Sequence, residues 1–155
     1  MVHIFICGEG DFMRNYIITD DVLCFTSNGY GTYVMEKNKD FYLSIDCLKL
    51  LKYGCNFYGN SYNIQRQFVI DIFNYYIKTP IIVFPTCTPS SKKCIWLAYN
   101  NITRYVKESN GTKIYFENGK EMNIKVPYTT IDNQITKCIK IEKYLNGIMR
   151  KTVEK

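Results

Sequence analysis

The segment 116–143, FENGKEMNIKVPYTTIDNQITKCIKIEK, constrains the fold more than any other part of the chain. Asn118-Gly119 lies between alternating apolar residues, which is the strongest short-range signal for a β-hairpin turn. Thr129 and Thr130 follow the hairpin and open a helix. A hairpin that leads into a basic helix indicates binding to a polyanion rather than catalysis.

The predicted helix covers 129–150, because apolar residues recur there with the helical period of about 100° per residue. One side of it holds Ile131, Ile135, Cys138, Leu145 and Met149. The other side holds Lys137, Lys140, Lys143 and Lys151. We expect Gly147 to break or weaken the last turn, because glycine is a poor helix former.

Charge is distributed unevenly along the 155 residues. Residues 1–50 carry 4 basic and 7 acidic side chains, a net charge of −3, whereas residues 51–155 carry 16 and 7, a net charge of +9. This asymmetry indicates an anionic partner for the second two thirds of the chain, most plausibly nucleic acid. A solvated lysine surface with no partner is the alternative. Tyrosine and phenylalanine are frequent, 14 and 9, and they favour β-sheets.

The pattern predicts one β-rich antiparallel α+β domain over residues 1–155, with a short central helix and a C-terminal amphipathic helix. Residues 1–45 read as a β meander, 46–128 as a β-rich middle and 129–150 as the helix. Asp20-Asp21 and Asn28-Gly29 suit tight turns. The strands expected in the meander are Ile4–Cys7, Tyr16–Thr19, Val22–Ser27, Tyr33–Glu36 and Phe41–Ile45.

The middle part begins with a short helix, Cys47–Lys52, which Asp46 caps and Gly54 ends. A turn-rich stretch, Cys55–Tyr62, follows it, and Thr86–Lys93 is expected to be a loop. The strands expected in this part are Gln67–Ile77, Ile81–Phe84, Ile95–Tyr99, Ile102–Val106, Ile114–Phe116 and Met122–Val126.

Several classes of function find little support in the sequence. The single histidine, His3, has no partners for a catalytic triad, and no phosphate-binding glycine loop occurs. The seven cysteines lack the close pairs of structural zinc sites, so we expect reduced thiols, no metal and no cofactor. No signal peptide or run of about 18 apolar residues is present. We therefore expect a cytoplasmic protein that is neither an enzyme nor a membrane protein.

The candidate DNA contacts are basic side chains outside the predicted core stripes, because phosphate binding supplies affinity without sequence information. A basic hairpin tip or loop suits the minor groove, and a basic helix suits the major groove; we favour the first. These candidates are Arg66, Lys92, Lys93, Arg104, Lys113, Lys120, Lys137, Lys140 and Lys143.

Several ordered blocks of the sequence resemble the ComK family of bacterial competence transcription factors. The block 55–62, CNFYGNSY, is similar to the family's C-x-F-[FY]-G-x-S pattern, and 78–83, KTPIIV, to K-x-P-I-x-V. The blocks 84–86, FPT, and 118–122, NGKEM, resemble F-P-T and N-G-K-x-M. The resemblance as a whole covers roughly residues 30–145. The positions that carry the likeness most clearly are Cys55, Phe57, Gly59, Cys94, Trp96, Asn118, Gly119, Asn133 and Gln134.

The resemblance implies an activator of DNA-uptake genes that binds paired A/T-rich boxes of double-stranded DNA, largely through the minor groove, as a homodimer or higher oligomer. Two departures accompany it. A turn and strand that the family carries between P-I-x-V and F-P-T are missing, since Val83 runs directly into Phe84. No apolar-aromatic C-terminal extension is present, which puts contact with an adaptor and protease in doubt.

Two other functions stay open at this point. The missing hairpin is consistent with a non-catalytic modulator that hetero-oligomerises with another transcription factor. The many aromatic residues are consistent with an RNA-binding β module that stacks bases on exposed rings.

Overall fold

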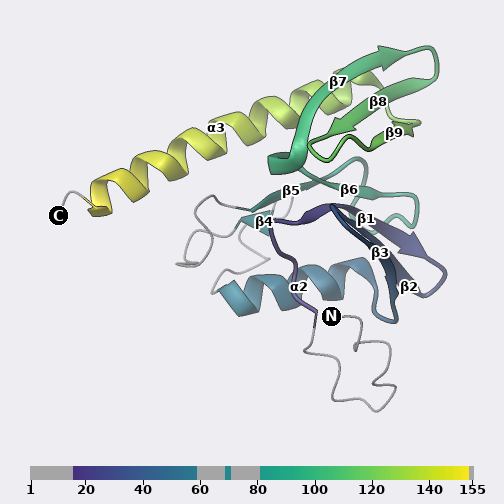
Figure 1. Cartoon of the computed structure of the whole chain (residues 1–155), viewed down its shortest axis with the longest axis horizontal. Coiled ribbons are helices and arrows are strands. Elements are labelled where there is room, and N and C mark those ends of the chain that lie inside the picture. The colour runs from purple at the N-terminus through teal and green to yellow at the C-terminus, as the bar shows by residue number, and fades with distance from the viewer. Residues whose placement is uncertain (1–15, 59–68, 71–80, 154–155) are drawn as a thin grey trace.

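Two antiparallel sheets and two helices make up the fold of the residues that the structure, a computed structural model, describes: 16–58, 69–70 and 81–153 (Figure 1). The first sheet has the strand order β3-β2-β1-β6-β5-β4 and the second the order β7-β8-β9. This arrangement confirms the predicted β-rich α+β fold.

The strands of the first sheet are β1 (Val22–Asn28), β2 (Gly31–Glu36), β3 (Asp40–Leu43), β4 (Val69–Ile70), β5 (Ile82–Pro85) and β6 (Ile95–Ala98). The remaining elements are α2 (Cys47–Tyr58), a 3₁₀ turn η3 (Tyr99–Asn101), β7 (Ile102–Glu108), β8 (Gly111–Phe116), β9 (Glu121–Ile124) and α3 (Tyr128–Val153).

The six-stranded sheet is the middle of three layers, and both of its faces are buried. Helix α2 packs on one face, while the three-stranded sheet and α3 lie on the other (Figure 1). Phe25 and Trp96 belong to the hydrophobic cluster on the α2 side, and Leu97 and Phe84 to the cluster on the α3 side. Strands that are buried on both sides read as nearly continuous apolar runs, which is why 81–84 and 95–98 contain few polar residues.

Strand β1 lies in the centre of this sheet, paired with β2 on one edge and β6 on the other. The pairing with β2 shifts register between Val22 and Cys24, so Leu23 is an extra residue in β1. Such a bulge re-aims neighbouring side chains. Leu23 and Cys24 accordingly both join the cluster on the α3 side.

Two hairpin turns follow the predictions of the sequence. Gly29 occupies the first central position of the β1–β2 turn with φ +63°, which fits the glycine requirement of a type II′ turn. The β8–β9 turn places Gly119 at φ +88°, after Asn118, whose Oδ1 accepts a hydrogen bond from the Lys120 amide at 3.1 Å. Both turns therefore depend on a glycine in the left-handed region.

Asp46 caps α2 as predicted, since its Oδ1 accepts a hydrogen bond from the Lys49 amide at 2.8 Å. The end of the helix was predicted wrongly: α2 continues through Gly54 to Tyr58, so the expected turn at 55–58 is helical. Likewise, α3 continues through Gly147 to Val153. A glycine inside a helix costs only about 1 kcal/mol, which packing of the helix readily offsets.

The predicted strand Tyr16–Thr19 is also wrong, because this segment joins no sheet in the described part of the chain. The alternation that suggested a strand comes from burial: the side chains of Tyr16 and Ile18 both enter the cluster on the α2 side. The predicted strand Ile4–Cys7, most of Gln67–Ile77 and the residues Arg66 and Gly59 lie outside the described residues.

One buried amide ties the two halves of the chain together. Asn101 is 3% exposed, and its Nδ2 donates to the carbonyl oxygens of Asp20 at 2.8 Å and Val22 at 2.6 Å. The Asn101 carbonyl accepts a hydrogen bond from the Glu117 amide at 2.9 Å. The start of β1 is therefore held beside the base of the three-stranded sheet.

Candidate nucleic-acid interface

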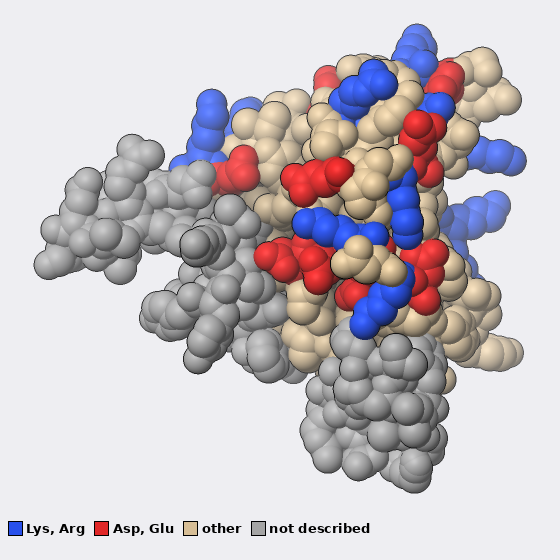
Figure 2. All heavy atoms as spheres, in the orientation of Figure 1, with Lys and Arg blue, Asp and Glu red and all other residues tan. Residues whose placement is uncertain are grey.

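The predicted DNA contacts that the structure describes lie in four separate regions. Lys92 and Lys93 are exposed in the β5–β6 loop, Arg104 and Lys113 lie on the outer face of the three-stranded sheet, and Lys120 lies in the β8–β9 loop. The remaining group, on α3, consists of Lys137, Lys140 and Lys143, all exposed. Figure 2 shows basic and acidic side chains alternating over the middle of one face, so this face offers no uniform positive surface. In the same view, basic side chains protrude along the right-hand edge, the side of the β1–β2 turn, the β5–β6 loop and the β7–β8 turn.

The β8–β9 loop, which we expected to meet DNA, is docked on the β2–β3 turn. The Asn118 Nδ2 donates to the Lys37 carbonyl at 2.9 Å, and Lys37 Nζ lies 3.5 Å from Glu117 Oε2. The Lys120 Nζ lies 3.3 Å from Asp40 Oδ1. Within the described residues, the charge of Lys120 is therefore shared with a carboxylate of the larger sheet.

We predict that Asp40→Asn and Lys120→Gln each lower the free energy of unfolding by less than about 1 kcal/mol, with a coupling of roughly 0.5 kcal/mol. The ion pair is weak because both side chains are about one third exposed, 33% for Asp40 and 37% for Lys120. Urea denaturation of the two single variants and the double variant measures the coupling. Lys92→Gln, at the opposite end of the sheet, is the control and should add to Asp40→Asn without coupling. Zero coupling would contradict a stabilising ion pair between Asp40 and Lys120.

Helix α3 turns its carboxylates inward and its lysines outward. Asp132 Oδ1 accepts a hydrogen bond from the Tyr105 hydroxyl at 2.7 Å, and Glu142 Oε1 accepts one from the Tyr99 hydroxyl at 2.9 Å. Burial, followed by the bond to Glu142, raises the pKa of Tyr99 to about 12; burial and the bond to Asp132 also raise the pKa of Tyr105. Both tyrosines therefore stay protonated donors at neutral pH. The described outward side of α3 is left with lysines as its charged residues.

Gln134 and Asn133, which are neighbours near the start of α3, differ in burial and in contacts. Gln134 Nε2 donates to the Pro85 carbonyl at 3.1 Å, which ties α3 to β5. Asn133 is exposed. The predicted core stripe of the helix is confirmed over its described part, because Ile131, Ile135 and Cys138 are buried.

The outer face of the three-stranded sheet combines cations with an aromatic ring. The Arg104 guanidinium lies 3.9 Å from the centre of the Tyr115 ring, and Lys113 Nζ lies 5.4 Å from it. Lys113 Nζ also lies 3.0 Å from Glu121 Oε1, and this hydrogen bond raises the pKa of Lys113. Arg104 therefore offers a more available charge than Lys113.

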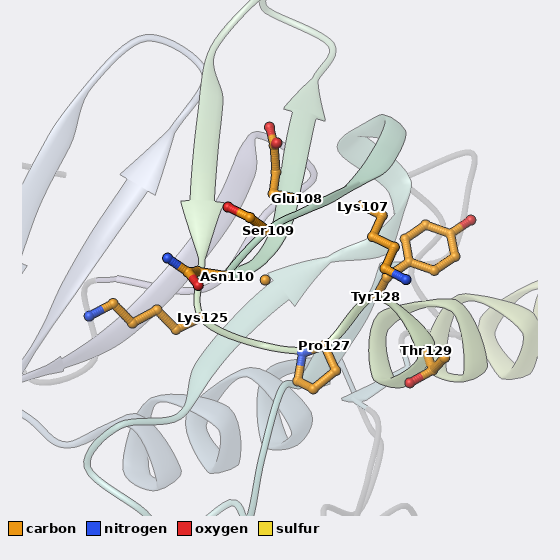
Figure 3. Close-up of a pocket in the computed structure, with 9 residues that line it drawn as sticks. Lys107, Glu108, Ser109, Asn110, Lys125, Pro127, Tyr128 and Thr129 are labelled. Atoms are coloured by element: carbon orange, nitrogen blue, oxygen red, sulfur yellow. The ribbon is translucent and has the colours of Figure 1, made fainter.

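Two hollows have basic residues in their linings, and the sequence alone did not single them out. One, of about 390 Å³, lies between the β7–β8 turn and the start of α3 and includes Lys107 and Lys125. Figure 3 shows the Lys125 side chain extending away from α3 and the Lys107 side chain lying toward Tyr128, so the two cations do not converge on one point. The other, of about 430 Å³, lies between the β1–β2 turn, α2 and the β5–β6 loop and includes Tyr30, Lys49, Lys52 and Lys92.

The signals for these hollows are weak in the sequence. Lys49 and Lys52 belong to a helix whose basic residues look like an ordinary solvated face. Tyr30 follows Asn28-Gly29, a position that a two-residue turn exposes, and this is the signal that could have identified it.

The remaining reactive groups of the described chain are mostly buried. Cys24, Cys47, Cys87, Cys94 and Cys138 are free, and Cys87 is the exposed one among these five. Burial raises the pKa of Cys24 and Cys138 to about 12 and that of Cys94 to about 11, which keeps these thiols protonated. Among residues 16–58, 69–70 and 81–153, no three His, Cys, Asp or Glu side chains gather as a metal site would require. No helix in these ranges is long and apolar enough to cross a membrane.

Comparison with known proteins gives two findings. The family model described as ComK protein matches residues 13–149. The competence transcription factor of Bacillus subtilis (strain 168) is 26% identical to the chain over 111 residues, which are 66% of this chain and 58% of that protein. The chain thus spans less than two thirds of the length of this relative. No solved structure matches the chain.

Proposed function

This chain belongs to the ComK family, and from that membership we propose that it is a competence transcription factor that binds A/T-rich duplex DNA, largely through the minor groove. The relative in Bacillus subtilis carries the name competence transcription factor. The proposal includes no catalytic role. It treats the chain as one DNA-binding domain, because the strands of the larger sheet contribute to the hydrophobic clusters on both of its faces.

The observation that carries the proposal is the separation of charge on α3. Asp132 and Glu142 are bound by tyrosine hydroxyls on the inner side, so Lys137, Lys140 and Lys143 face solvent without a carboxylate partner among the described residues. Lysines left free in this way release counterions when they meet phosphates, which is the main source of affinity for DNA.

The predicted DNA contacts are expected to contribute unequally to the affinity for DNA. Lys92 and Lys93, exposed in the β5–β6 loop, form a second group of cations that makes no ion pair with any described residue. Lys113 and Lys120 each share their charge with a carboxylate, so we assign them smaller contributions. Arg104 stacks on Tyr115 and keeps its guanidinium edge available. Arg66 lies outside the described residues and stays a prediction.

Salt titration of A/T-box binding tests the proposal. We expect tighter binding to a duplex with two A/T boxes than to a G/C duplex of equal length. The logarithm of the association constant should fall linearly as log[salt] rises. Changing Lys137, Lys140 and Lys143 to Gln should reduce that slope by about 0.9 for each phosphate that the protein no longer neutralises. Fluorescence anisotropy at several salt concentrations measures both quantities.

The control removes two lysines from the β2–β3 turn, Lys37→Gln with Lys39→Gln, and should leave the slope nearly unchanged because Lys37 already pairs with Glu117. Equal affinity for both duplexes at every salt concentration would overturn specific recognition. A flat salt dependence with a stable protein complex would favour the modulator, and stronger binding to single-stranded RNA would favour the RNA module. Comparing one-box with two-box duplexes tests the homodimer or higher oligomer that the resemblance implies, since paired copies bind two boxes cooperatively.

A further inference from the structure

Tyr30 is the most exposed large aromatic residue of the described chain, at 93%. It occupies the second central position of the β1–β2 turn, after Gly29. Lys92 Nζ lies over this ring, 5.7 Å from its centre. An aromatic side chain that is so exposed adds little to the folded core and is accessible to a ligand.

The turn that presents Tyr30 is braced from below. The Tyr42 hydroxyl donates to the Asn28 carbonyl at 3.0 Å, across the base of the turn. Gly31 packs so closely on β3 that a methyl group there would overlap the Leu43 carbonyl oxygen. The backbone that carries the ring is therefore held in place, and the turn loses little conformational entropy when the ring binds.

A basic hollow of about 430 Å³ lies beside this ring. Its lining includes the cations Lys49, Lys52 and Lys92, and Asp46 is the acidic residue in it. The Asp46 carboxylate is already occupied as the cap of α2, because its Oδ1 accepts the hydrogen bond from the Lys49 amide. The lining thus carries a net positive charge next to an exposed aromatic ring.

The opposite wall of the hollow is also held in place. The β5–β6 loop closes with the Thr86 amide donating to the Ile95 carbonyl at 3.0 Å and the Ile95 amide donating to Thr86 Oγ1 at 3.0 Å. Thr26 pairs with Ile95, which sets this loop beside the β1–β2 turn at the same end of the larger sheet. Lys92 and Tyr30 therefore belong to one preformed surface.

We propose that Tyr30 enters a base step of the bound duplex and stacks there, while Lys49, Lys52 and Lys92 bind the flanking phosphates. This inference rests on the proposed function and names the residue that reads the deformability of the DNA. A side chain that wedges between bases kinks the duplex, and flexible steps cost less to open than stiff ones. The minor groove of B-DNA, about 6 Å wide, suits a single ring on a narrow turn.

Tyr30→Ala is the direct test, measured with a duplex that carries 2-aminopurine at successive positions of the A/T box. With the unchanged protein, we expect the fluorescence to rise at one step, because the base analogue brightens when it is unstacked. Tyr30→Ala should abolish that rise and weaken binding about tenfold, the typical loss for one aromatic–base stack. Tyr30→Phe should keep both the fluorescence signal and the affinity.

Two further variants separate stacking from charge. Lys92→Gln should reduce the salt slope by about 0.9, whereas Tyr30→Ala should leave the slope unchanged. Tyr144→Ala is the matched control, because it also removes an exposed tyrosine, but one that lies on α3. This variant should keep the fluorescence rise. Circular dichroism of each variant checks that the fold is intact.

The outcomes distinguish this inference from the function on which it rests. If the unchanged protein does not prefer the A/T duplex, the proposed function fails. If it does prefer that duplex but Tyr30→Ala binds equally well and the same step stays bright, the Tyr30 inference alone is overturned. Loss of the signal in both Tyr30→Ala and Tyr30→Phe would also overturn stacking, because the ring would then not suffice.

Discussion

Trp96→Ala is expected to lower the free energy of unfolding by about 3–5 kcal/mol, a large share of the roughly 5–15 kcal/mol that stabilises a typical domain. Trp96 is fully buried in β6, and its ring stacks on that of Phe25 in β1. The two ring centres are 6.0 Å apart, and the interplanar angle is 7°. Removing it leaves a cavity between the larger sheet and α2. The cavity cannot collapse, because the side chains around it are closely packed. Chemical denaturation followed by far-UV circular dichroism measures the destabilisation, since the substitution removes the only tryptophan.

Trp96→Phe is the matched control for this prediction. It keeps an aromatic ring against Phe25, and it gives up no described hydrogen bond, because Trp96 Nε1 has no partner among the described residues. We therefore expect a smaller decrease in stability, about 1–2 kcal/mol. Equal decreases for the two variants would contradict the central packing role that we give to this ring.

Gly111→Ala is expected to destabilise the protein by roughly 3 kcal/mol, the second-largest effect that we predict. Gly111 begins β8 with φ +149°, a backbone conformation that side chains rarely adopt. A methyl group there would also overlap the Ile124 carbonyl oxygen of β9. Strain and overlap therefore add, and either the turn or the pairing of β8 with β9 has to shift. Thermal and urea denaturation measure the change in stability.

Gly119→Ala separates the two causes. Gly119 also has a positive φ, +88°, but nothing lies within 4 Å of the position that its methyl group would take. Only the strain of the left-handed conformation remains there, about 1–2 kcal/mol. If Gly111→Ala costs no more than Gly119→Ala, the overlap with β9 is not the reason for the glycine.

The parts of the fold that the sequence predicted well are those with local causes. The turn at Asn118-Gly119 and the buried stripe of α3 depend on residues a few positions apart; the turn is confirmed, and so is the stripe at Ile131, Ile135 and Cys138. The segment Tyr16–Thr19 was mistaken for a strand because burial alternates there without any sheet pairing. Helix α2 passes Gly54 because the cost of one glycine is smaller than the gain from packing the helix on the sheet.

The surface was harder to predict than the core, because a side chain's role there depends on distant partners. Lys120 seemed a free cation at a hairpin tip, yet Asp40, 80 positions earlier, neutralises it. The acidic residues of α3 gave no sign that tyrosines would bind them and leave the lysines alone outside. Tyr30 was one tyrosine among 14 until the fold exposed it beside lysines from α2 and the β5–β6 loop.

The central position of β1 has a consequence for how the protein is made. β1, its partner β2 and the next strand β3 leave the ribosome early, but the other edge of β1 pairs with β6, and Asn101 reaches back 81 positions to Asp20. Because synthesis proceeds at about 5–20 residues per second, this edge of β1 stays unpaired for several seconds before β6 is made. During that interval the nascent chain exposes an unpaired strand, which is the structure most prone to aggregate. The yield of folded protein should therefore depend on chaperones and fall as synthesis temperature rises.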